Sequence, residues 1–207
     1  MPFLSTNTLD CLIRNGKCIE NGDVNKLKHG AYELCLGNEY YITGGKRKNK
    51  KSLKENGQVT INAGQFALFI TEEIINMPND CLGLISFRNK FKSQGIVNVS
   101  GFHVDPGYRG RLKFSLFNAG GKSVTFQQGE KTFLIWFAKF DKENIPYGEK
   151  SENFEIGSKD LNNIHDETIS LKSLDKRINK YEIWMPILIT LIIGLIITMV
   201  PIFLGVK

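Results

Sequence analysis

The chain has few residues that could form a soft metal site or a disulfide framework. It contains only four cysteines, and no two of them have C-x-x-C spacing: Cys11, Cys18, Cys35 and Cys81. Isolated cysteines of this kind are typical of reduced, structural thiols rather than of a small secreted domain. Its three histidines are scattered, and no H-x-E motif accompanies a P-C-x-x-C motif: His29, His103 and His165. We therefore expect no zinc.

Aromatic residues are absent from the most strongly charged segment, residues 44–56. Its six basic side chains match the formal net charge of the whole chain, +6: Lys46, Arg47, Lys48, Lys50, Lys51 and Lys54. Because no aromatic is interleaved for base stacking, nucleic acid is not an expected partner. Two interpretations stay open, a solvated loop and a loop attracted to anionic lipid at ~1 kcal/mol per basic residue near the surface.

Charged side chains are also missing from residues 186–206, and this absence predicts a membrane span. About 20 apolar residues at ~1.5 Å each cross the ~30 Å hydrocarbon core of a bilayer. The alternative, a core helix that is apolar on all sides, would need a large protein around it. Pro201 is expected to kink the span, and Trp184 to lie at the membrane interface.

The charges that flank this span predict its orientation. Four basic residues precede it, whereas only Lys207 follows it: Lys172, Lys176, Arg177 and Lys180. Basic flanks favour the cytoplasmic side. Residues 1–14 show no signal peptide. We therefore expect a single-pass membrane protein with a C-terminal anchor and a cytoplasmic globular domain.

Short runs rich in Val, Ile, Phe and Tyr, separated by Gly, Asn and Pro, dominate the rest of the chain. We expect them to be strands: residues 33–36, 58–61, 66–70, 82–87, 111–117 and 132–140. This pattern predicts an all-β fold, a distorted barrel or jelly roll, in one domain with a single core.

Residues 157–183 change to a helical composition. Apolar residues recur near every 3.5 positions, although Glu167 interrupts them: Ile164, Leu171, Leu174, Ile178 and Tyr181. A coiled-coil stalk and a single amphipathic helix that lies on the barrel or the membrane both fit this pattern. The predicted division is a β domain at 1–156, a helical stalk or linker at 157–183 and a transmembrane anchor at 184–207.

A candidate site begins at the stretch from Gly101 to Gly110, G-F-H-V-D-P-G-Y-R-G. Asp105 ends a β-branched and aromatic run, Pro106-Gly107 has turn composition, and a new strand follows Gly110. The carboxylate is thus expected where the chain reverses. Taken alone, this is equally the pattern of an ordinary hairpin.

Several further segments accompany this turn. They are F-L-S at 3–5, A-Y-E-L-C-L-G-N-E at 31–39, I-N-A-G-Q-F at 61–66, T-E at 71–72, M-P at 77–78, F-N at 117–118, Q-G at 128–129 and P-Y at 146–147. Together they resemble the dCTP deaminase branch of the dUTPase superfamily over residues 3–154. The resemblance implies a dUTPase-like barrel with a short N-terminal helix, and a homotrimer that binds a nucleoside triphosphate at each subunit interface.

The resemblance also implies the residues of that site. In the segment from Arg88 to Ser93, R-N-K-F-K-S, the arginine is kept, while Asn89 and Ser93 replace the family's phosphate-binding serine and second arginine. Lys90 and Lys92 still offer cationic donors to a triphosphate. Further nucleotide-binding positions follow by the same alignment: Asp105, Tyr108, Lys113, Phe114, Gln128 and Tyr147. Phe102-His103 and Asn153-Phe154 depart from the family's base-site pairs.

One departure concerns catalysis directly. The family's general-acid/base glutamate lies two residues before the aromatic-asparagine pair, and Ser115 stands there in this chain. A serine has no suitable pKa for a proton transfer that is typically worth 10²–10⁴-fold in rate. Cytosine deamination is therefore in doubt.

Removal of pyrophosphate from a nucleotide, as in dUTPases, has other requirements. Asp105 matches the residue that orients the attacking water, and Glu33 stands where related enzymes carry an aspartate near Mg²⁺. Magnesium is thus a possible cofactor. The family's glycine-rich closing segment is not evident, because residues 151–163 contain only Gly157.

Three functions follow from these observations. The first is a membrane-tethered, deaminase-deficient nucleotide sensor, in which a deoxypyrimidine triphosphate binds at a trimer interface. The second is an anchored but active dCTP deaminase or dUTPase-like hydrolase. The third is a structural trimerisation or docking module with a vestigial site.

Overall fold

The computed structural model describes residues 2–45, 47–142, 154–164 and 171–203, with side chains of the last stretch described at 178–197. The chain divides into two units, Met1–Thr168 and Ile169–Lys207. The first contains the β domain and a short helix that packs on it, and the second contains one long helix. Each unit is described by itself below.

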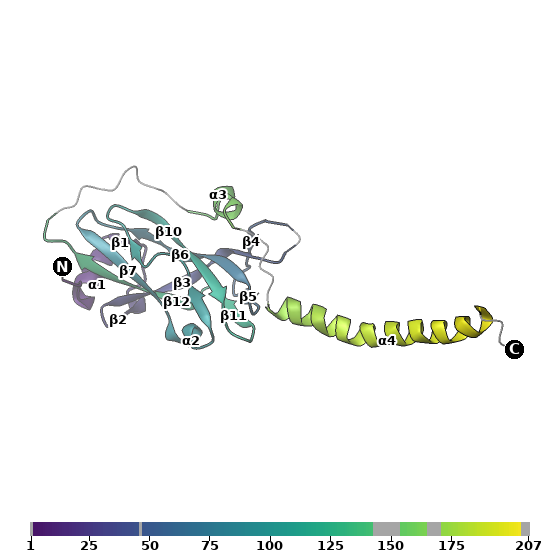
Figure 1. Ribbon diagram of the computed structural model, residues 1–207. Helices are drawn as coiled ribbons and strands as arrows, with labels where there is room; N and C mark the ends of the chain where they lie inside the picture. Colours follow the sequence, from purple (N-terminus) through teal and green to yellow (C-terminus); the bar gives the residue numbers. More distant parts are fainter. Residues whose placement is uncertain (1, 46, 143–153, 165–170, 204–207) are drawn as a thin grey trace. The chain divides into compact units, whose positions relative to one another are not determined.

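The β domain consists of many short strands and few helices (Figure 1). In chain order they are α1 (Thr6–Arg14), β1 (Cys18–Glu20), the 3₁₀ turn η1 (Val24–Lys26), β2 (Leu27–Lys28), β3 (Ala31–Ile42), β4 (Lys51–Ser52), β5 (Gln58–Ile61), β6 (Phe66–Asn76), β7 (Cys81–Phe87), α2 (Asn89–Lys92), β8 (Ile96–Asn98), β9 (His103–Val104), β10 (Arg109–Asn118), β11 (Val124–Gln127), β12 (Lys131–Lys139) and α3 (Ser158–Asn162). The predicted all-β architecture is confirmed.

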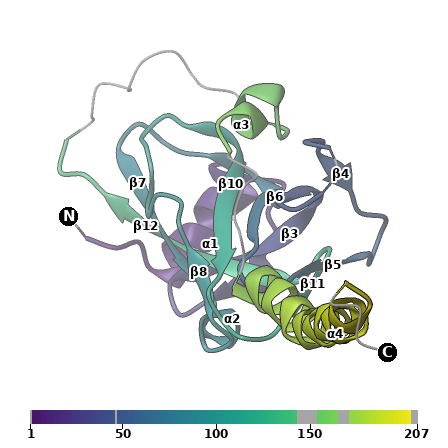
Figure 2. The same cartoon turned by 45° about the vertical axis from the view of Figure 1, so that its right-hand side comes forward.

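Ten of these strands form one curled antiparallel sheet (Figures 1 and 2). Its main path runs β8-β10-β6-β3-β12-β7-β9, and β1, β2 and β4 attach to it at the side. Strands β11 and β5 form a separate two-stranded sheet. Many neighbouring strands are far apart in sequence, as β3 and β12 are. Side chains from distant parts of the β domain therefore meet on one surface.

Phenylalanine rings fill the core between the sheet faces. Phe114 stacks on Phe133 with ring centroids 3.5 Å apart, and Phe126 lies 4.5 Å from Phe91 and 5.2 Å from Phe69. Each fully buried ring stabilises the fold by roughly 1.5–3 kcal/mol. Strand β10 alternates strictly, so its even-numbered residues point into this core and its odd-numbered residues face outward.

The N-terminal helix forms where the sequence predicted one. The Ser5 hydroxyl accepts a hydrogen bond from the Thr8 amide and caps α1. Leu9 and Ile13, one turn apart, are buried against the sheet. Gly16 follows with a φ of +68° and ends the helix in a left-handed conformation.

Two loops cross at Gly95 and Gly120. Gly95 has a φ of +90°, and a Cβ placed on it would lie 2.5 Å from the Gly120 Cα. Buried Asn118 ties the same region together, because its amide donates to the carbonyls of Ile61 and Lys122. Only glycine fits this crossing.

Residues 154–164 overlap the start of the predicted stalk or linker, 157–183. They contain α3, and Ile156 and Leu161 are buried against Tyr41, Leu68 and Ile70 on the outer surface of β3 and β6. Both cartoon views place α3 over the side of the domain that carries β10 and β6 (Figures 1 and 2). The division into domain, stalk and anchor stays a prediction, but this part of it packs on the β domain.

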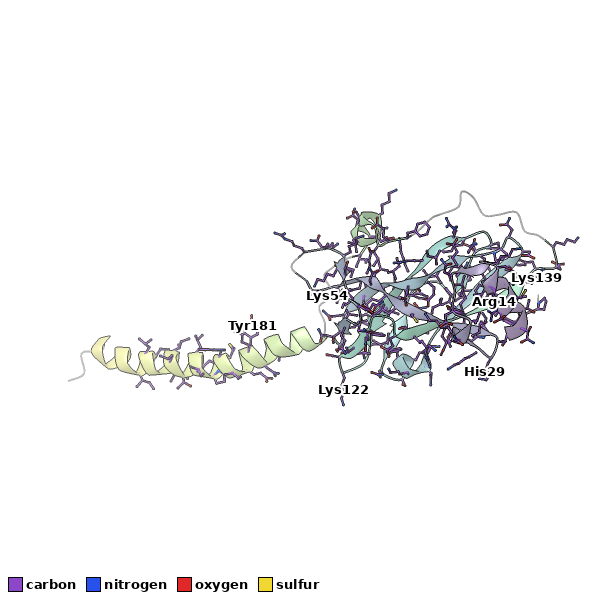
Figure 3. All side chains as sticks on the ribbon, turned by 180° about the vertical axis from the view of Figure 1, so that it is seen from behind. Arg14, His29, Lys54, Lys122, Lys139 and Tyr181 are labelled. Atoms are coloured by element: carbon purple, nitrogen blue, oxygen red, sulfur yellow. The ribbon has the colours of Figure 1, made fainter. Side chains whose placement is uncertain are left out.

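The second unit contains a single continuous helix, α4 (Leu171–Phe203). Residues 178–197 of this helix are long and apolar enough to cross a membrane, and none of them is buried. The large apolar side chains between Ile178 and Ile197 are exposed, and Figure 3 labels Tyr181 among them. The helix passes through Pro201 without ending there.

Candidate functional site

A cluster of cations surrounds one buried carboxylate where β7 leads into α2. Glu33 on β3 is only 3% exposed. Its carboxylate lies 2.6 Å from Lys131, 3.1 Å from Arg88 and 3.8 Å from Lys28. Three cations against one carboxylate leave this cationic cluster with a formal charge of +2.

Electrostatics keep Glu33 ionised. Burial alone would raise its pKa, but the hydrogen bond and charge of Lys131, together with the charges of Arg88 and Lys28, outweigh burial and lower the pKa from its ordinary value of 4.5. The carboxylate therefore holds the ends of the Arg88 and Lys131 side chains in place.

The contacts of Glu33 bear on its expected role near Mg²⁺, which stays a prediction. One carboxylate oxygen faces Arg88, and the other faces Lys131 and Lys28. A cation would have to displace these side chains to reach either oxygen. In this arrangement Glu33 positions cationic side chains.

Arg88 connects the segment from Arg88 to Ser93 to the cationic cluster. Arg88 caps the start of α2, and its amide donates to the Thr132 carbonyl at 3.0 Å. Lys90 pairs with Glu130 at 2.6 Å, and Lys92 donates to the Ser86 hydroxyl at 3.0 Å. Asn89 and Ser93 are exposed at the two ends of this single helical turn.

The Asp-Pro-Gly-Tyr stretch forms the tight turn that the sequence predicts. The Tyr108 amide donates to the Asp105 carbonyl at 3.2 Å, and Gly107 has a φ of +76°. The Asp105 side chain is 56% exposed and lies 3.4 Å from Nε2 of His103. The Tyr108 hydroxyl instead donates to the Arg111 carbonyl at 2.7 Å, which fixes the turn against β10.

The outward face of β10 carries the position of the missing glutamate. Ser115 is half-buried there, and its amide donates to the Ser100 hydroxyl at 3.3 Å. Within the described residues, neither a carboxylate nor an imidazole hydrogen-bonds to it. On the same face, Lys113 forms an ion pair with Asp160 of α3 at 2.7 Å.

The side chain of Phe114 lies in the core. It is 1% exposed and stacks on Phe133, because it occupies an inward position of β10. Its predicted place among the nucleotide-binding residues stays a prediction. Its neighbours Lys113 and Ser115 face outward.

Gln128 lines a polar cavity of about 260 Å³ that sequence reasoning missed. Its side-chain oxygen accepts a hydrogen bond from the Asn56 amide at 3.1 Å. Arg111 also lines the cavity, 3.4 Å from Asn38. The pairing registers of β3, β10 and β12 each contain an irregularity, between Leu36 and Tyr40, Arg111 and Lys113, and Lys131 and Phe133. The sequence carries no residue pattern that predicts such bulges.

Some predicted positions lie outside the described residues. They are Tyr147, Asn153, Lys46, His165 and Glu167. Most of the remaining predicted residues fall into three groups, the cationic cluster with α2, the Asp105 turn and the outward face of β10. Gln128 lies apart from these at the polar cavity, and the Phe114 side chain lies in the core.

The four cysteines are free, as expected for structural thiols. Burial raises the pKa of Cys18 to about 12, and that of Cys35 and Cys81 to about 11. Such thiols are poor nucleophiles near neutral pH. Cys11 on α1 is exposed.

A family model for dCTP deaminase-like proteins matches residues 3–140. The chain belongs to the dCTP deaminase-like family. The resemblance drawn from the motifs is thereby confirmed, and it extends through β12 to the end of the barrel.

Curated relatives agree with this assignment. The dCTP deaminase of Thermococcus kodakarensis is 33% identical over 132 residues, which cover 64% of this chain and 82% of that protein. The dCTP deaminase of Pyrococcus horikoshii is 30% identical over 139 residues, covering 67% and 86%.

A solved structure shows the same fold. The 2'-deoxycytidine 5'-triphosphate deaminase of Agrobacterium tumefaciens superposes with a TM-score of 0.56 at 14% identity. The superposition covers 65% of this chain and 48% of that one. The dCTP deaminase-like domain therefore corresponds to the β domain.

Proposed function

We propose that this dCTP deaminase-like protein is a membrane-anchored nucleotide sensor that binds a deoxypyrimidine nucleoside triphosphate and lacks efficient deaminase activity. The observation that carries the proposal is the cationic cluster around Glu33. Its residues Arg88, Lys131 and Lys28 are partly exposed at their charged ends, with 38%, 36% and 59% of each side chain accessible.

The cluster suits a polyphosphate in charge and in geometry. Its net positive charge attracts a ligand with several negative charges, and a guanidinium offers paired donors to phosphate oxygens. Glu33 orients the Arg88 and Lys131 side chains before the ligand arrives, so fewer rotamers must be fixed on binding. Lys90 and Lys92 extend the positive surface along α2.

Deaminase deficiency is inferred from Ser115. The serine lies on an outward face among neutral hydrogen-bonding partners, and its hydroxyl cannot supply the proton transfer that a carboxylate provides. The binding residues at the cationic cluster are independent of this loss. Nucleotide recognition without turnover fits both observations.

Membrane attachment and assembly complete the proposal. Helix α4 contains a stretch with the length and composition of a bilayer span, and the basic residues in its first turns, ahead of the uncharged residues 186–206, favour a cytoplasmic β domain. We expect a homotrimer, in which three parallel chains place three anchors in one membrane and share a nucleotide site at each interface.

An anchored hydrolase is the second candidate, because Asp105 is exposed beside His103. An accessible carboxylate paired with an imidazole could orient a water molecule toward a phosphate.

The third candidate, a structural docking module, is the function expected if no nucleotide binds.

Calorimetric titration of the full-length protein in lipid nanodiscs tests the proposal. We expect dCTP, dUTP or dTTP to bind, and Arg88→Ala to weaken binding about tenfold or more through loss of a charged double contact. The control is Lys122→Ala, which removes an exposed cation from the β10–β11 loop, labelled in Figure 3. Absence of binding to all common nucleoside triphosphates would contradict the proposal.

Product analysis on the same samples separates sensor from enzyme. We expect no ammonia from dCTP and no pyrophosphate from dUTP with Mg²⁺ above the level given by Asp105→Ala. Release of either product by the wild type alone would favour the active enzyme.

A further inference from the structure

A groove of about 610 Å³ lies on the outward face of the strands that carry the cationic cluster. It is lined by Leu84 of β7 and Trp136 of β12, which are opposite each other in the strand register. Phe3, which is 60% exposed, lines it from the N-terminal segment. The described residues that line this groove include no Lys, Arg, Asp or Glu, and we call it the apolar groove.

Hydrogen bonds fix the walls of the apolar groove before any ligand binds. The Leu4 amide donates to the Phe137 carbonyl of β12 at 2.8 Å, which holds the N-terminal segment beside the sheet. The Gly30 amide donates to the Thr6 hydroxyl at 3.0 Å and so joins the start of α1 to the turn between β2 and β3. His29, labelled in Figure 3, lies on this turn. A pre-formed apolar pocket of this volume is typical of small-molecule sites.

The strand registers place the apolar groove next to the cationic cluster. Glu33 is opposite Leu134, and Leu134 is opposite Ser86. Trp136 and Leu84 form the next row of outward residues, two positions along the same two strands. Trp136 is therefore a diagonal neighbour of Glu33, at a separation of roughly 7–8 Å. The apolar groove and the cationic cluster adjoin on one face of the sheet.

The turn between β2 and β3 makes a second connection between the two. Lys28 lies 3.8 Å from the Glu33 carboxylate and belongs to the cationic cluster. The next two residues, His29 and Gly30, line the apolar groove. A ligand that fills the groove therefore has the cations of the cluster beside it.

This combined surface fits a ligand with a flat apolar ring at one end and several negative charges at the other. Trp136 offers an indole face for stacking, whereas Arg88 and Lys131 offer donors to phosphate oxygens. In a nucleotide, one sugar separates the base from the phosphates, a span comparable to that between the groove and the cluster. An inorganic polyphosphate can occupy only the charged part of this surface.

We infer that the base of the nucleotide stacks on Trp136 in the apolar groove while its phosphates pair with Arg88 and Lys131. This inference rests on the proposed nucleotide function and adds the residue that recognises the base. Because every base has an aromatic face, Trp136 favours a nucleotide over free polyphosphate without choosing among bases. Stacking of this kind changes affinity by about 5-fold to 150-fold.

Tryptophan fluorescence reads the stacked contact directly. Trp184→Phe leaves Trp136 as the only tryptophan of the chain. In this full-length variant in phosphatidylcholine nanodiscs, dCTP, dUTP or dTTP should quench the Trp136 emission, because the base lies against the indole. Inorganic tripolyphosphate should bind without quenching. Equal quenching by tripolyphosphate would show an indirect effect and contradict the stacked base.

Calorimetric affinities in the same nanodiscs separate the base from the phosphates. Trp136→Ala should weaken nucleotide binding about tenfold or more and leave tripolyphosphate binding within about twofold of the wild type. Trp136→Phe keeps an aromatic face and should restore most of the nucleotide affinity. Trp184→Ala is the matched control, the same change in α4, and should bind both ligands like the wild type.

These measurements distinguish the inference from the proposed function. Tripolyphosphate binding shows that Trp136→Ala is folded, and if this variant does not fold, the quenching result decides. If nucleotides bind without quenching and Trp136→Ala binds them like the wild type, the inference is wrong while the proposed function stands. If no nucleotide binds, both fail.

A second copy of the chain is the other possible occupant of the apolar groove. Mass photometry of Trp136→Ala tests it. A changed number of subunits, with an unchanged ratio of nucleotide to tripolyphosphate affinity, would show that a second copy covers the groove and would overturn the inference.

Discussion

Glu33 is the residue that sets the charge balance of the cationic cluster. It is buried, ionised and in contact with cations from β2, β12 and the start of α2. Removing such a carboxylate leaves like charges facing one another with no counter-charge. Its effect on stability should therefore depend on pH.

The first prediction concerns Glu33→Gln. The folded pKa of Glu33 is lowered from 4.5, so its stabilising contribution is fully present above that pH and is lost as pH falls through the folded pKa. We expect the variant to lose about 1–3 kcal/mol of unfolding free energy at pH 7. The deficit should shrink below pH 4.5, as measured by urea unfolding.

A matched control for this experiment is Glu55→Gln, at an exposed position on the β4–β5 connection. It should leave the unfolding free energy unchanged. A deficit of Glu33→Gln that stays constant from pH 7 down to pH 3 would show that lost packing, and not lost charge, explains it.

Residue types predicted part of this site and missed the rest. The resemblance of the R-N-K-F-K-S segment to the family's motif pointed to Arg88, Lys90 and Lys92. The contacts of Glu33 could not be predicted, because its partner Lys131 is 98 positions away in sequence. The burial of Phe114 was missed because one residue along a strand separates an outward face from the core.

At the scale of elements, local composition predicted the longer strands, and the family resemblance implied the first helix. Strand β5 has the predicted bounds, and β10 follows the alternation of apolar and polar residues. The contacts that dock residues 154–164 on the sheet could not be predicted from composition, because the Ile156 contact to Glu39 joins residues 117 positions apart.

A second prediction concerns the crossing of the loops at Gly95. In Gly95→Ala the new Cβ would meet the Gly120 backbone at 2.5 Å, in a backbone conformation that alanine rarely adopts. We expect a loss of about 3 kcal/mol in unfolding free energy, which lowers the thermal midpoint by roughly 6–12 °C.

Gly101→Ala is the comparison for this variant. A Cβ at Gly101 meets nothing within 4 Å. Its thermal midpoint should stay within about 2 °C of the wild type. Equal destabilisation by both changes would mean that the crossing itself is not what requires glycine.

At the scale of the whole molecule, the family fold and an added apolar helix are the two main features. The family could be recognised from the sequence because its motifs are spread along most of the β domain. The trimer was implied only by resemblance and stays a prediction, since contacts between chains leave no local signal in one sequence.

The third prediction tests whether α4 enters a bilayer. Leu191→Asp/Leu195→Asp places two charges in the span, each of which costs roughly 2.5–3.5 kcal/mol at the centre of a membrane helix. We expect the wild type to sediment with membranes after carbonate washing and the double variant to be released. Leu191→Ala/Leu195→Ala should sediment like the wild type. A wild type that remains in solution without detergent would contradict the anchor.

The contrast between one accessible thiol and three buried ones makes the unmodified chain suitable for optical studies. A maleimide dye should attach to Cys11 alone under native conditions, because the other sulfurs are enclosed and protonated. The fluorophore would then sit on the N-terminal helix, remote in sequence from Arg88 and from the membrane helix. Counting the bleaching steps of single labelled particles in a supported bilayer would give the number of subunits directly.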